Sequence, residues 1–397
     1  MLIAIIILIV VIAIWLGLDF YLGKKARMEQ IEPSRLPVRH SSCSFYNEGR
    51  DFFSVLFDDI ENAQKHIHLL FYIFRDDTIG MELIQRLIKK SSEGVKVRVL
   101  IDAIGSHKLS KSARKLLKEN NIELGLSNRP KFPFFFYTLN HRNHRKIGVI
   151  DGNIGYIGGF NIGDEYLGKD PKLGYWRDYQ LRINGDGVQD LQQQFVEDWR
   201  IAGMSITKDR SLYPELEKGP ISLKLEPTEG IDMNYSFLDY IESAEKSIVV
   251  GTPYYIPGLK IQNALITAAR KKINVKIILP FKADHPLVKE AAFRYFLPLL
   301  EAGCEIYQYQ KGFYHAKVLL IDDELCDIGT ANFDKRSFHI NSEINCILKD
   351  GKLLEVIKKT IEQDIKDSER LTIGKFKGRP ILQRLKEPFA DLLSYFL

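Results

Sequence analysis

The same signature occurs twice in the chain, 171 residues apart, and this repeat restricts the possible architecture more than any other feature. In each copy a lysine follows a histidine by two positions, an aspartate by seven, a glycine by fourteen and an asparagine by seventeen. The first copy consists of His144, Lys146, Asp151, Gly158 and Asn161, and the second of His315, Lys317, Asp322, Gly329 and Asn332. Two complete matches exclude coincidence, so the chain is expected to contain two halves of one structural repeat.

Other segments recur in the same order around the signature. The blocks at 60–65 and 241–246 are similar, and each precedes an apolar run, a β-branched run and an amphipathic stretch. Short strands that alternate with helices are typical of βαβ units. We therefore predict an α/β fold of two domains related by a pseudo-twofold axis, with mixed, mainly parallel sheets and an active site at the domain interface. The expected limits are 37–206 for the first domain and 207–397 for the second.

An apolar run opens the chain. Residues 2–18 contain no charged side chain, and Lys24, Lys25 and Arg27 follow them. Seventeen apolar residues are just enough to span a bilayer, so we expect a transmembrane anchor over 1–23 and a linker over 24–36. Positive charge on the C-terminal side predicts that the body lies in the cytoplasm of a single-pass membrane protein. A signal peptide would need a basic start and a small-residue cleavage site, both absent here. A buried helix of a soluble protein is the alternative.

The charge balance limits the partners that the chain can bind. There are 56 basic and 51 acidic residues, which gives a net charge of +5. A nucleic-acid-binding domain is expected to be far more basic, whereas this balance is compatible with an anionic membrane surface. The four cysteines form no CxxC pair and no Cys/His cluster, so neither a disulfide scaffold nor a structural zinc site is expected.

The residue types of the signature suit phosphodiester chemistry. Alternate side chains of a strand share a face, so each histidine points the same way as the lysine two positions later. Two halves that meet would surround one phosphodiester with two imidazoles and two ammonium groups. One histidine would attack phosphorus, and the other would protonate the leaving alcohol and deprotonate the incoming one. The lysines, helped by Asn161 and Asn332, would stabilise the phosphate oxygens, so no metal or other cofactor is needed.

The two aspartates complete each signature and are therefore candidate catalytic residues. Their odd offset from histidine, however, predicts that Asp151 and Asp322 lie on the opposite face of the strand, where a structural role is expected. His141 and Arg142, beside the first copy, could also reach the phosphate.

The doubled His-x-Lys signature resembles that of the phospholipase D superfamily. Further segments are similar to those of the bacterial cardiolipin synthases, in particular the shorter, single-anchor kind: 156–166, 175–178, 252–257, 312–315 and 329–337. The resemblance covers nearly all of the chain after about residue 40. It implies a phosphatidyltransferase of the bacterial cell membrane that joins two phosphatidylglycerol molecules into cardiolipin and releases glycerol. It also implies that His144 is the nucleophile and that His315 is the acid and base. Each histidine is expected to be oriented by a carboxylate downstream of it, for which Asp178 and Glu343 are the matching candidates.

Three alternative functions remain, of which two would use the same residues for a different reaction and one is not enzymatic. A phospholipase D would pass the phosphatidyl group to water or to another alcohol, and a nuclease would cleave a nucleic-acid backbone. The apolar run and the balanced charge argue against the nuclease, so we expect no nucleic-acid partner. A membrane scaffold with a decayed site is the third alternative, but both copies of the signature are complete.

Two apolar segments have two interpretations each. The aromatic run at 131–137 precedes the first histidine and is either a buried strand or loop or an aromatic lip that enters the bilayer. Residues 381–396 have the spacing of an amphipathic helix. That helix either packs against the second domain or docks on the membrane, with Arg379, Arg384 and Lys386 at the lipid surface.

Overall fold

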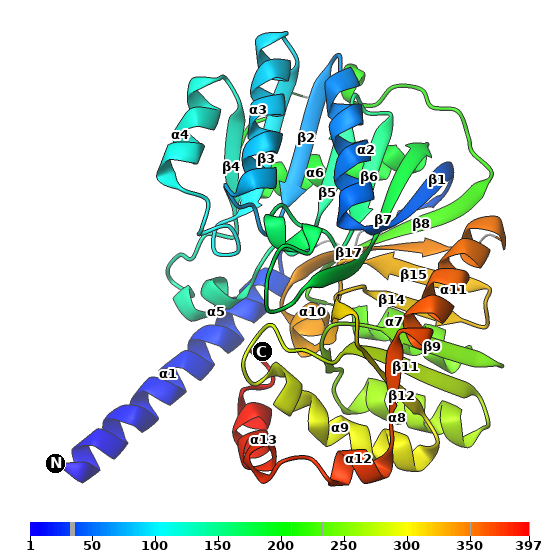
Figure 1. Cartoon of the computed structure of the whole chain (residues 1–397). Helices are drawn as coiled ribbons and strands as arrows, with labels where there is room; N and C mark the ends of the chain where they lie inside the picture. Colours follow the sequence, from blue (N-terminus) through cyan, green and yellow to red (C-terminus); the bar gives the residue numbers. More distant parts are fainter. Residues whose placement is uncertain (32–35, 208, 232, 350, 397) are drawn as a thin grey trace.

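The computed structural model describes residues 1–31, 36–207, 209–231, 233–349 and 351–396 (Figure 1). A long helix, α1 (Leu2–Met28), precedes the body of the protein. The strands of the first half are β1 (Val38–Glu48), β2 (His66–Phe71), β3 (Lys96–Asp102), β4 (Glu123–Ser127), β5 (Ile147–Ile150), β6 (Ile154–Gly158) and β7 (Tyr175–Gly185). Its helices are α2 (Gly49–Asn62), α3 (Thr78–Ser92), α4 (Lys111–Glu119), α5 (Phe135–Asn140), the 3-10 helix η1 (Asp164–Leu167) and α6 (Gly187–Ile201).

The second half follows the 3-10 helix η2 (Arg210–Leu212). Its strands are β8 (Ile221–Glu229), β9 (Ser247–Gly251), β10 (Tyr255–Ile256), β11 (Asn274–Pro280), β12 (Glu305–Tyr309), β13 (Gly312–Tyr314), β14 (Val318–Ile321), β15 (Leu325–Gly329), β16 (Phe333–Asp334), β17 (Ser342–Leu348) and β18 (Ser368–Leu371). Its helices are α7 (Met233–Glu242), α8 (Leu259–Arg270), α9 (Val288–Ala302), α10 (Lys335–His339), α11 (Gly351–Lys366), α12 (Ile373–Lys377) and α13 (Ile381–Leu393).

Local sequence explains where several helices begin. The Asp77 carboxylate accepts from the backbone N–H of Gly80 at the start of α3. The Ser110 hydroxyl caps α4 in the same way through Ala113. Such caps satisfy backbone donors that a helix start leaves without intrahelical partners. Lys89 and Lys90 lie in the last turn of α3, where they complement the helix dipole.

One sheet runs through both halves. Within the described residues it contains sixteen strands, and β1 and β8 pair antiparallel at its middle (Figure 1). Outward from β1 the order is β7, β6, β5, β2, β3, β4, and outward from β8 it is β17, β15, β14, β9, β11, β12, β18. The two orders correspond strand by strand as far as β4 and β12. The structure therefore confirms the two repeated α/β halves.

The sheet differs from the prediction in two respects. It is continuous rather than split between domains, because β1 and β8 pair across the boundary. It is also not mainly parallel: the central pairs are antiparallel, and parallel pairing in the main order occurs in the outer groups β2–β3–β4 and β9–β11–β12. Tight turns such as the one at 151–153 can join only antiparallel neighbours, whereas helices α3 and α4 provide the long crossovers that parallel neighbours need.

The buried core joins the halves in the same way. One cluster combines apolar side chains of α6 and α11 with Leu181 from β7, Leu225 from β8 and Ile344 from β17. A second cluster, under α8 and α9, lies within the second half, and a third, under α2 and α3, belongs to the first half apart from Phe313 of β13. Because the shared cluster is buried on both sides of the boundary, the two halves form one packing unit where they meet.

Helix α1 is longer than the predicted anchor. It is apolar and long enough to cross a membrane, its residues 2–15 are exposed, and its N-terminal part projects away from the body (Figure 1). It continues through Met28, so residues 24–28, predicted as linker, are helical. Contacts with the body explain the difference: Lys24 Nζ lies 3.3 Å from Tyr395 Oη, and Arg27 pairs with Glu229 at 2.8 Å. Residues 32–35 of the predicted linker lie outside the described residues.

Candidate active site

The two signature histidines meet at the junction of the halves, and the backbone explains how. The N–H of His144, which precedes β5, donates to the carbonyl of Ser342 at the start of β17, 2.9 Å away. The N–H of His315, which follows β13, donates to the carbonyl of Arg177 in β7 at 2.7 Å. Each histidine is thus fixed to a strand of the opposite half.

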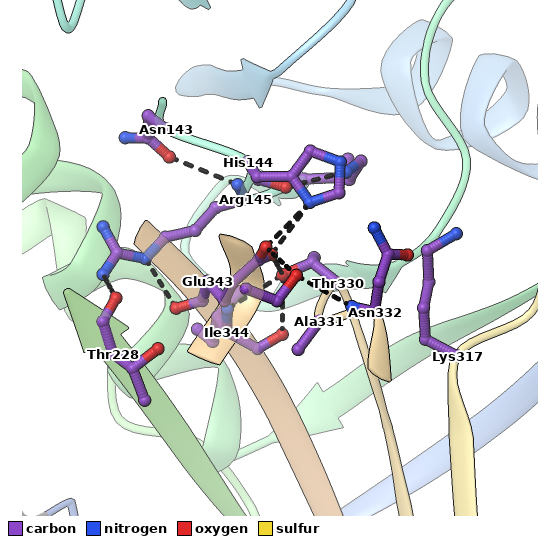
Figure 2. A network of polar contacts seen from close by, with 12 residues as sticks. Asn143, His144, Arg145, Thr228, Lys317, Thr330, Ala331, Asn332, Glu343 and Ile344 are labelled. Carbon is purple, nitrogen blue, oxygen red and sulfur yellow. Dashed lines mark hydrogen bonds and ion pairs between the residues drawn. The ribbon is translucent and has the colours of Figure 1, made fainter. Parts of the chain in front are cut away.

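His144 is oriented by a carboxylate of the second half. Its Nδ1 lies 3.0 and 2.9 Å from the two oxygens of Glu343 (Figure 2). The same carboxylate accepts hydrogen bonds from the Thr330 hydroxyl at 2.6 Å and the Ser337 hydroxyl at 2.8 Å. Because Glu343 is completely buried and held by these groups, it fixes the tautomer of His144 with the proton on Nδ1 and the lone pair on Nε2.

His315 is oriented by a carboxylate of the first half. Its Nδ1 lies 2.5 Å from Asp178 Oδ2, and the other carboxylate oxygen accepts from the backbone N–H of Tyr179 at 2.9 Å. Gly159 leaves the room that this carboxylate needs, because a Cβ at position 159 would lie 1.9 Å from Asp178 Oδ1. Gly159, which directly follows the glycine of the first signature, therefore serves the histidine of the second.

The two lysines are placed differently. Lys317 Nζ lies 2.5 Å from His315 Nδ1, 3.2 Å from His315 Nε2 and 3.5 Å from Asp178 Oδ2. Lys146 Nζ instead donates to the carbonyl of His144 at 2.7 Å and lies over the ring of Tyr72. Lys317 also donates to the carbonyl of His315, so both lysines contact the backbone of their own histidine, and the difference is that Lys317 additionally lies against the ring.

The charges of the site follow from burial and proximity. Burial raises and the neighbouring cations lower the pKa of Glu343 and of Asp178, and the net pKa of each lies below its usual value. Burial lowers the pKa of His144 to about 4, although Glu343 opposes the shift. Burial and then Lys317 lower the pKa of His315 to about 3. At neutral pH the free site therefore holds two neutral imidazoles and two carboxylates.

Burial also lowers the pKa of Lys146 to about 7 and that of Lys317 to about 8. Each lysine lowers the pKa of the histidine in the opposite half as well, which means that all four groups share one electrostatic environment. A phosphodiester placed between the histidines would meet two ammonium groups that are destabilised by burial. An anion relieves that penalty, so the free site is prepared for anion binding.

These lysine pKa values predict an alkaline limit to turnover. As pH rises through about 7 and 8, Lys146 and Lys317 lose their protons and the site loses the charge that attracts the phosphodiester. The rate constant kcat/KM, which reports the free enzyme, should fall over this range, whereas kcat should fall at higher pH because the bound phosphate raises both lysine pKa values. A kcat/KM profile in mixed micelles that stays flat from about pH 7 to pH 10 would contradict this assignment.

The two aspartates of the signature lie away from the histidines. Asp151 accepts from the backbone N–H groups of Gln64, Lys65 and His66 at 2.7 to 2.9 Å. Asp322 accepts from three consecutive N–H groups, 245–247, at 2.7 Å each. Neither carboxylate contacts a signature histidine, as their odd offset predicts, so the structure favours the structural role over the catalytic one. Each carboxylate organises the turn that leads into β2 or β9.

The two asparagines differ. Asn161 Oδ1 accepts from the N–H of Ile73 at 3.0 Å, and its amide nitrogen lies 3.1 Å from Tyr166 Oη, so this side chain is largely engaged in the scaffold. The side chain of Asn332 is buried, and its Oδ1 has no hydrogen-bond partner among the described residues. Figure 2 shows the Asn332 amide beside the Lys317 side chain, facing the same space. Because an amide oxygen cannot donate to an anion, Nδ2 of Asn332 is the atom that would contact a phosphate oxygen in the space beside Lys317.

The two basic residues considered beside the first signature are engaged in the scaffold. Arg142 pairs with the buried carboxylate of Asp102 at 3.1 Å and donates to the carbonyl of Thr138. His141 Nε2 lies 3.2 Å from Ser342 Oγ. Neither side chain is therefore free to act as a phosphate ligand.

Two aromatic residues of the site were not predicted from the sequence. Tyr72 and Trp176 contact the rings of His144 and His315, with ring centroids 4.8 Å apart in both pairs. The indole N–H of Trp176 is buried without a partner among the described residues. Trp176 lies two positions before Asp178, in the segment 175–178 that resembles the cardiolipin synthases, so the sequence contained a signal for it. Tyr72 follows an apolar strand and carries no motif of its own.

A buried ion network supports the first histidine from behind. Arg145 is fully buried and donates to Asp198 at 2.6 Å, to Glu229 at 2.6 Å and to the carbonyl of Glu343 at 3.0 Å. Such a guanidinium fixes three segments at once. Arg145 lies between the histidine and the lysine of the first signature, which is a signal for a site residue. Its partners could not be predicted, because they are distant in sequence and belong to no motif.

Comparisons with known proteins agree with this geometry. A family profile described as cardiolipin synthase, phospholipase D-like domain, matches residues 56–199 and 237–365. The chain is 42% identical over 396 residues to the minor cardiolipin synthase ClsB of Bacillus subtilis, which covers 100% of this chain and 99% of that one. It is 39% identical over 365 residues to the major cardiolipin synthase ClsA of the same organism, covering 90% and 76%. A solved phosphatidylserine synthase of Haemophilus influenzae has the same fold, with a TM-score of 0.70 at 17% identity over 94% of this chain and 100% of that one.

Proposed function

The chain belongs to the phospholipase D-like cardiolipin synthase family, and from this premise we propose that it joins two phosphatidylglycerol molecules through a covalent intermediate on His144. It is a phosphatidyltransferase with the activity of a cardiolipin synthase. The observation that carries the proposed mechanism is the exchange of carboxylates across the junction, in which Glu343 holds His144 and Asp178 holds His315.

In the first step, His144 Nε2 attacks the phosphorus of one phosphatidylglycerol. A nitrogen–phosphorus bond forms, the bond from phosphorus to the glycerol oxygen breaks, and His315 gives its proton to that oxygen, so free glycerol leaves. The anionic phosphodiester raises the pKa of the adjacent His315, so this ring takes up a proton from solvent when the lipid binds and returns it to solvent when cardiolipin leaves. Lys146, Lys317 and Asn332 would stabilise the charge on the phosphate oxygens.

In the second step, the terminal hydroxyl of another phosphatidylglycerol attacks the same phosphorus. His315 takes the hydroxyl proton, the nitrogen–phosphorus bond breaks, and cardiolipin leaves with both histidines restored. No proton, electron or further group is left over, so the scheme requires no cofactor.

The unequal lysine contacts support the assignment of roles. An ammonium group 3.2 Å from His315 Nε2 makes the protonated ring a stronger acid, which suits a proton donor. Lys146 contacts the backbone of His144 rather than its ring, so Nε2 of His144 has no signature ammonium group against it, which suits a nucleophile.

Transfer to a lipid rather than to water fits a buried site on a membrane. The side chains of His144 and His315 are only 10% and 9% exposed, which limits the access of water. We place residues 2–18 of α1 in the bacterial cell membrane as a single span, and the positive charges that follow the run put the body on the cytoplasmic side. An anchored site meets its lipid acceptor at high local concentration.

A lipid product assay tests the reaction. Full-length protein in phosphatidylglycerol bilayers, with EDTA present, should form cardiolipin and glycerol in equal amounts, as read by mass spectrometry. Phosphatidic acid as the sole lipid product would identify a phospholipase D instead. Loss of turnover with EDTA, restored by a divalent cation, would contradict a scheme in which lysines supply the positive charge.

A further inference from the structure

Two apolar surfaces near the base of α1 are exposed and have no partner among the residues that the structure describes. On α13, Ile381, Leu385, Phe389 and Leu392 are 75%, 70%, 56% and 78% exposed, and their spacing puts them on one face of the helix. On and before α5, Phe132, Phe135 and Leu139 are 76%, 37% and 36% exposed. We call these seven residues the docking surface. Exposed apolar side chains concentrated in this way usually mark an interaction site.

The docking surface is connected to α1 by an aromatic cluster. The ring of Phe20 packs edge-on against Phe136 and Tyr137 of α5 and against Tyr395 and Phe396, which follow α13. Figure 1 shows α5 and α13 at the end of the molecule from which α1 projects. The apolar run of α1 and the docking surface therefore belong to one continuous region.

Polar contacts hold α1 rigidly in this region. Asp19 is buried, and its carboxylate accepts from the N–H of Tyr137 at 2.8 Å, inside α5. Gly23 allows α1 to touch α5, because a Cβ there would lie 2.6 Å from the Cβ of Tyr137 and 2.8 Å from that of Phe134. Helix α1 is thus a fixed stalk rather than a flexible tether, and it holds the docking surface at a set distance from the apolar run.

Basic side chains accompany both apolar surfaces. Arg129 and Lys131 precede Phe132, and Arg384 and Lys386 flank Leu385. All four are exposed, and none takes part in an ion pair within the described part of the chain. Apolar side chains bordered by unpaired cations match the interface of an anionic bilayer, where acyl chains lie beneath negative headgroups.

We propose that the docking surface lies in the interface of the anionic bilayer that α1 spans, so that the body touches the membrane at α5 and α13 as well as through its anchor. This membrane contact would lie close in the structure to both copies of the signature. Helix α5 ends four residues before His144. The segment after α13 contacts α10 through Lys335 and Ser394, 2.8 Å apart, and α10 follows Asn332 and β16.

Depth-dependent quenching tests the proposal on the full-length protein in phosphatidylglycerol nanodiscs. A fluorophore is attached to Leu385→Cys or Phe132→Cys, and to Lys118→Cys on α4 as the matched exposed control. The unsubstituted protein reports any labelling of the native cysteines. Lipids with a spin label on the acyl chain should quench the probes at 385 and 132 several-fold more strongly than the probe at 118. Equal quenching at all three positions would overturn the proposal, as would cross-linking of two 385 positions in separate copies.

A paired substitution connects the surface to turnover. Leu385→Glu with Phe389→Glu should reduce the rate on bilayers by roughly tenfold and leave the rate on short-chain phosphatidylglycerol in detergent unchanged, because only the first substrate requires docking. An equal loss on both substrates would instead assign these residues to folding. The quenching measurement needs no turnover, so its result does not depend on whether the proposed reaction is correct. A failure of the docking proposal can therefore be distinguished from a failure of the proposed function.

Discussion

Replacing either signature histidine by alanine is expected to lower cardiolipin formation by about 10³-fold or more. His144→Ala removes the atom that attacks phosphorus, and His315→Ala removes the group that protonates the leaving glycerol. Both residues act in both steps, so the double variant should be little worse than either single one. The measurement is initial-rate formation of cardiolipin from phosphatidylglycerol in vesicles.

A matched control separates chemistry from folding. His107 is exposed and lies outside the site, so His107→Ala should retain the rate of the unsubstituted protein. Thermal unfolding should still show a cooperative transition in both histidine variants, at a lower midpoint than in His107→Ala, because each leaves a buried carboxylate, Glu343 or Asp178, without its imidazole partner. Turnover within tenfold of the unsubstituted rate in either single variant would contradict the paired-histidine mechanism.

The two orienting carboxylates should matter nearly as much. Asp178→Asn and Glu343→Gln keep the size of each side chain but remove the acceptor that fixes the proton on Nδ1, so each is expected to lower kcat by about 10²- to 10⁴-fold. The two losses should differ in kind. A nitrophenolate leaving group departs without being protonated, so a lipid that carries it does not need the acid His315. This substrate should restore the first step in Asp178→Asn, in which the acid is impaired, and not in Glu343→Gln, in which the nucleophile is impaired.

Asp323→Asn is the matched control for these variants. Its carboxylate is 44% exposed, pairs with Lys358 at the surface and lies outside the site, so its loss should leave kcat unchanged. Restoration of nitrophenol release in Glu343→Gln, but not in Asp178→Asn, would reverse the assignment of nucleophile and acid. Unchanged kcat in both variants would remove the carboxylates from the mechanism.

The repeat made much of the fold predictable. Identical spacing in two places fixes equivalent local structure, and the resulting α/β halves are confirmed. The prediction of mainly parallel strands was wrong, because strands and helices alternate only in the outer parts of each half. The strands β5, β6 and β7 follow one another without an α-helical crossover, and strands joined in this way pair antiparallel.

The site was predictable where residues carry a motif. The two orienting carboxylates are the ones that the family resemblance implies, but the pairing is the reverse of the expected one: His144 contacts Glu343 and His315 contacts Asp178, so neither histidine is held by the downstream carboxylate of its own half. The exchange between halves could not be derived from spacing alone, since it depends on β1 and β8 closing the two halves into one sheet. The supports around Glu343 and Arg145 come from distant segments without motifs, and only tertiary structure identifies them.

The covalent intermediate on His144 is the central claim, and an activated substrate tests it most directly. His315→Ala is mixed with a nitrophenyl ester of phosphatidic acid, nitrophenolate release is followed by absorbance, and the quenched protein is digested for mass spectrometry. The account predicts a burst of one nitrophenolate per protein molecule and a phosphatidyl adduct on the peptide that contains His144, with no burst from His144→Ala. A burst from His144→Ala with an adduct on His315, or release without any adduct, would contradict it.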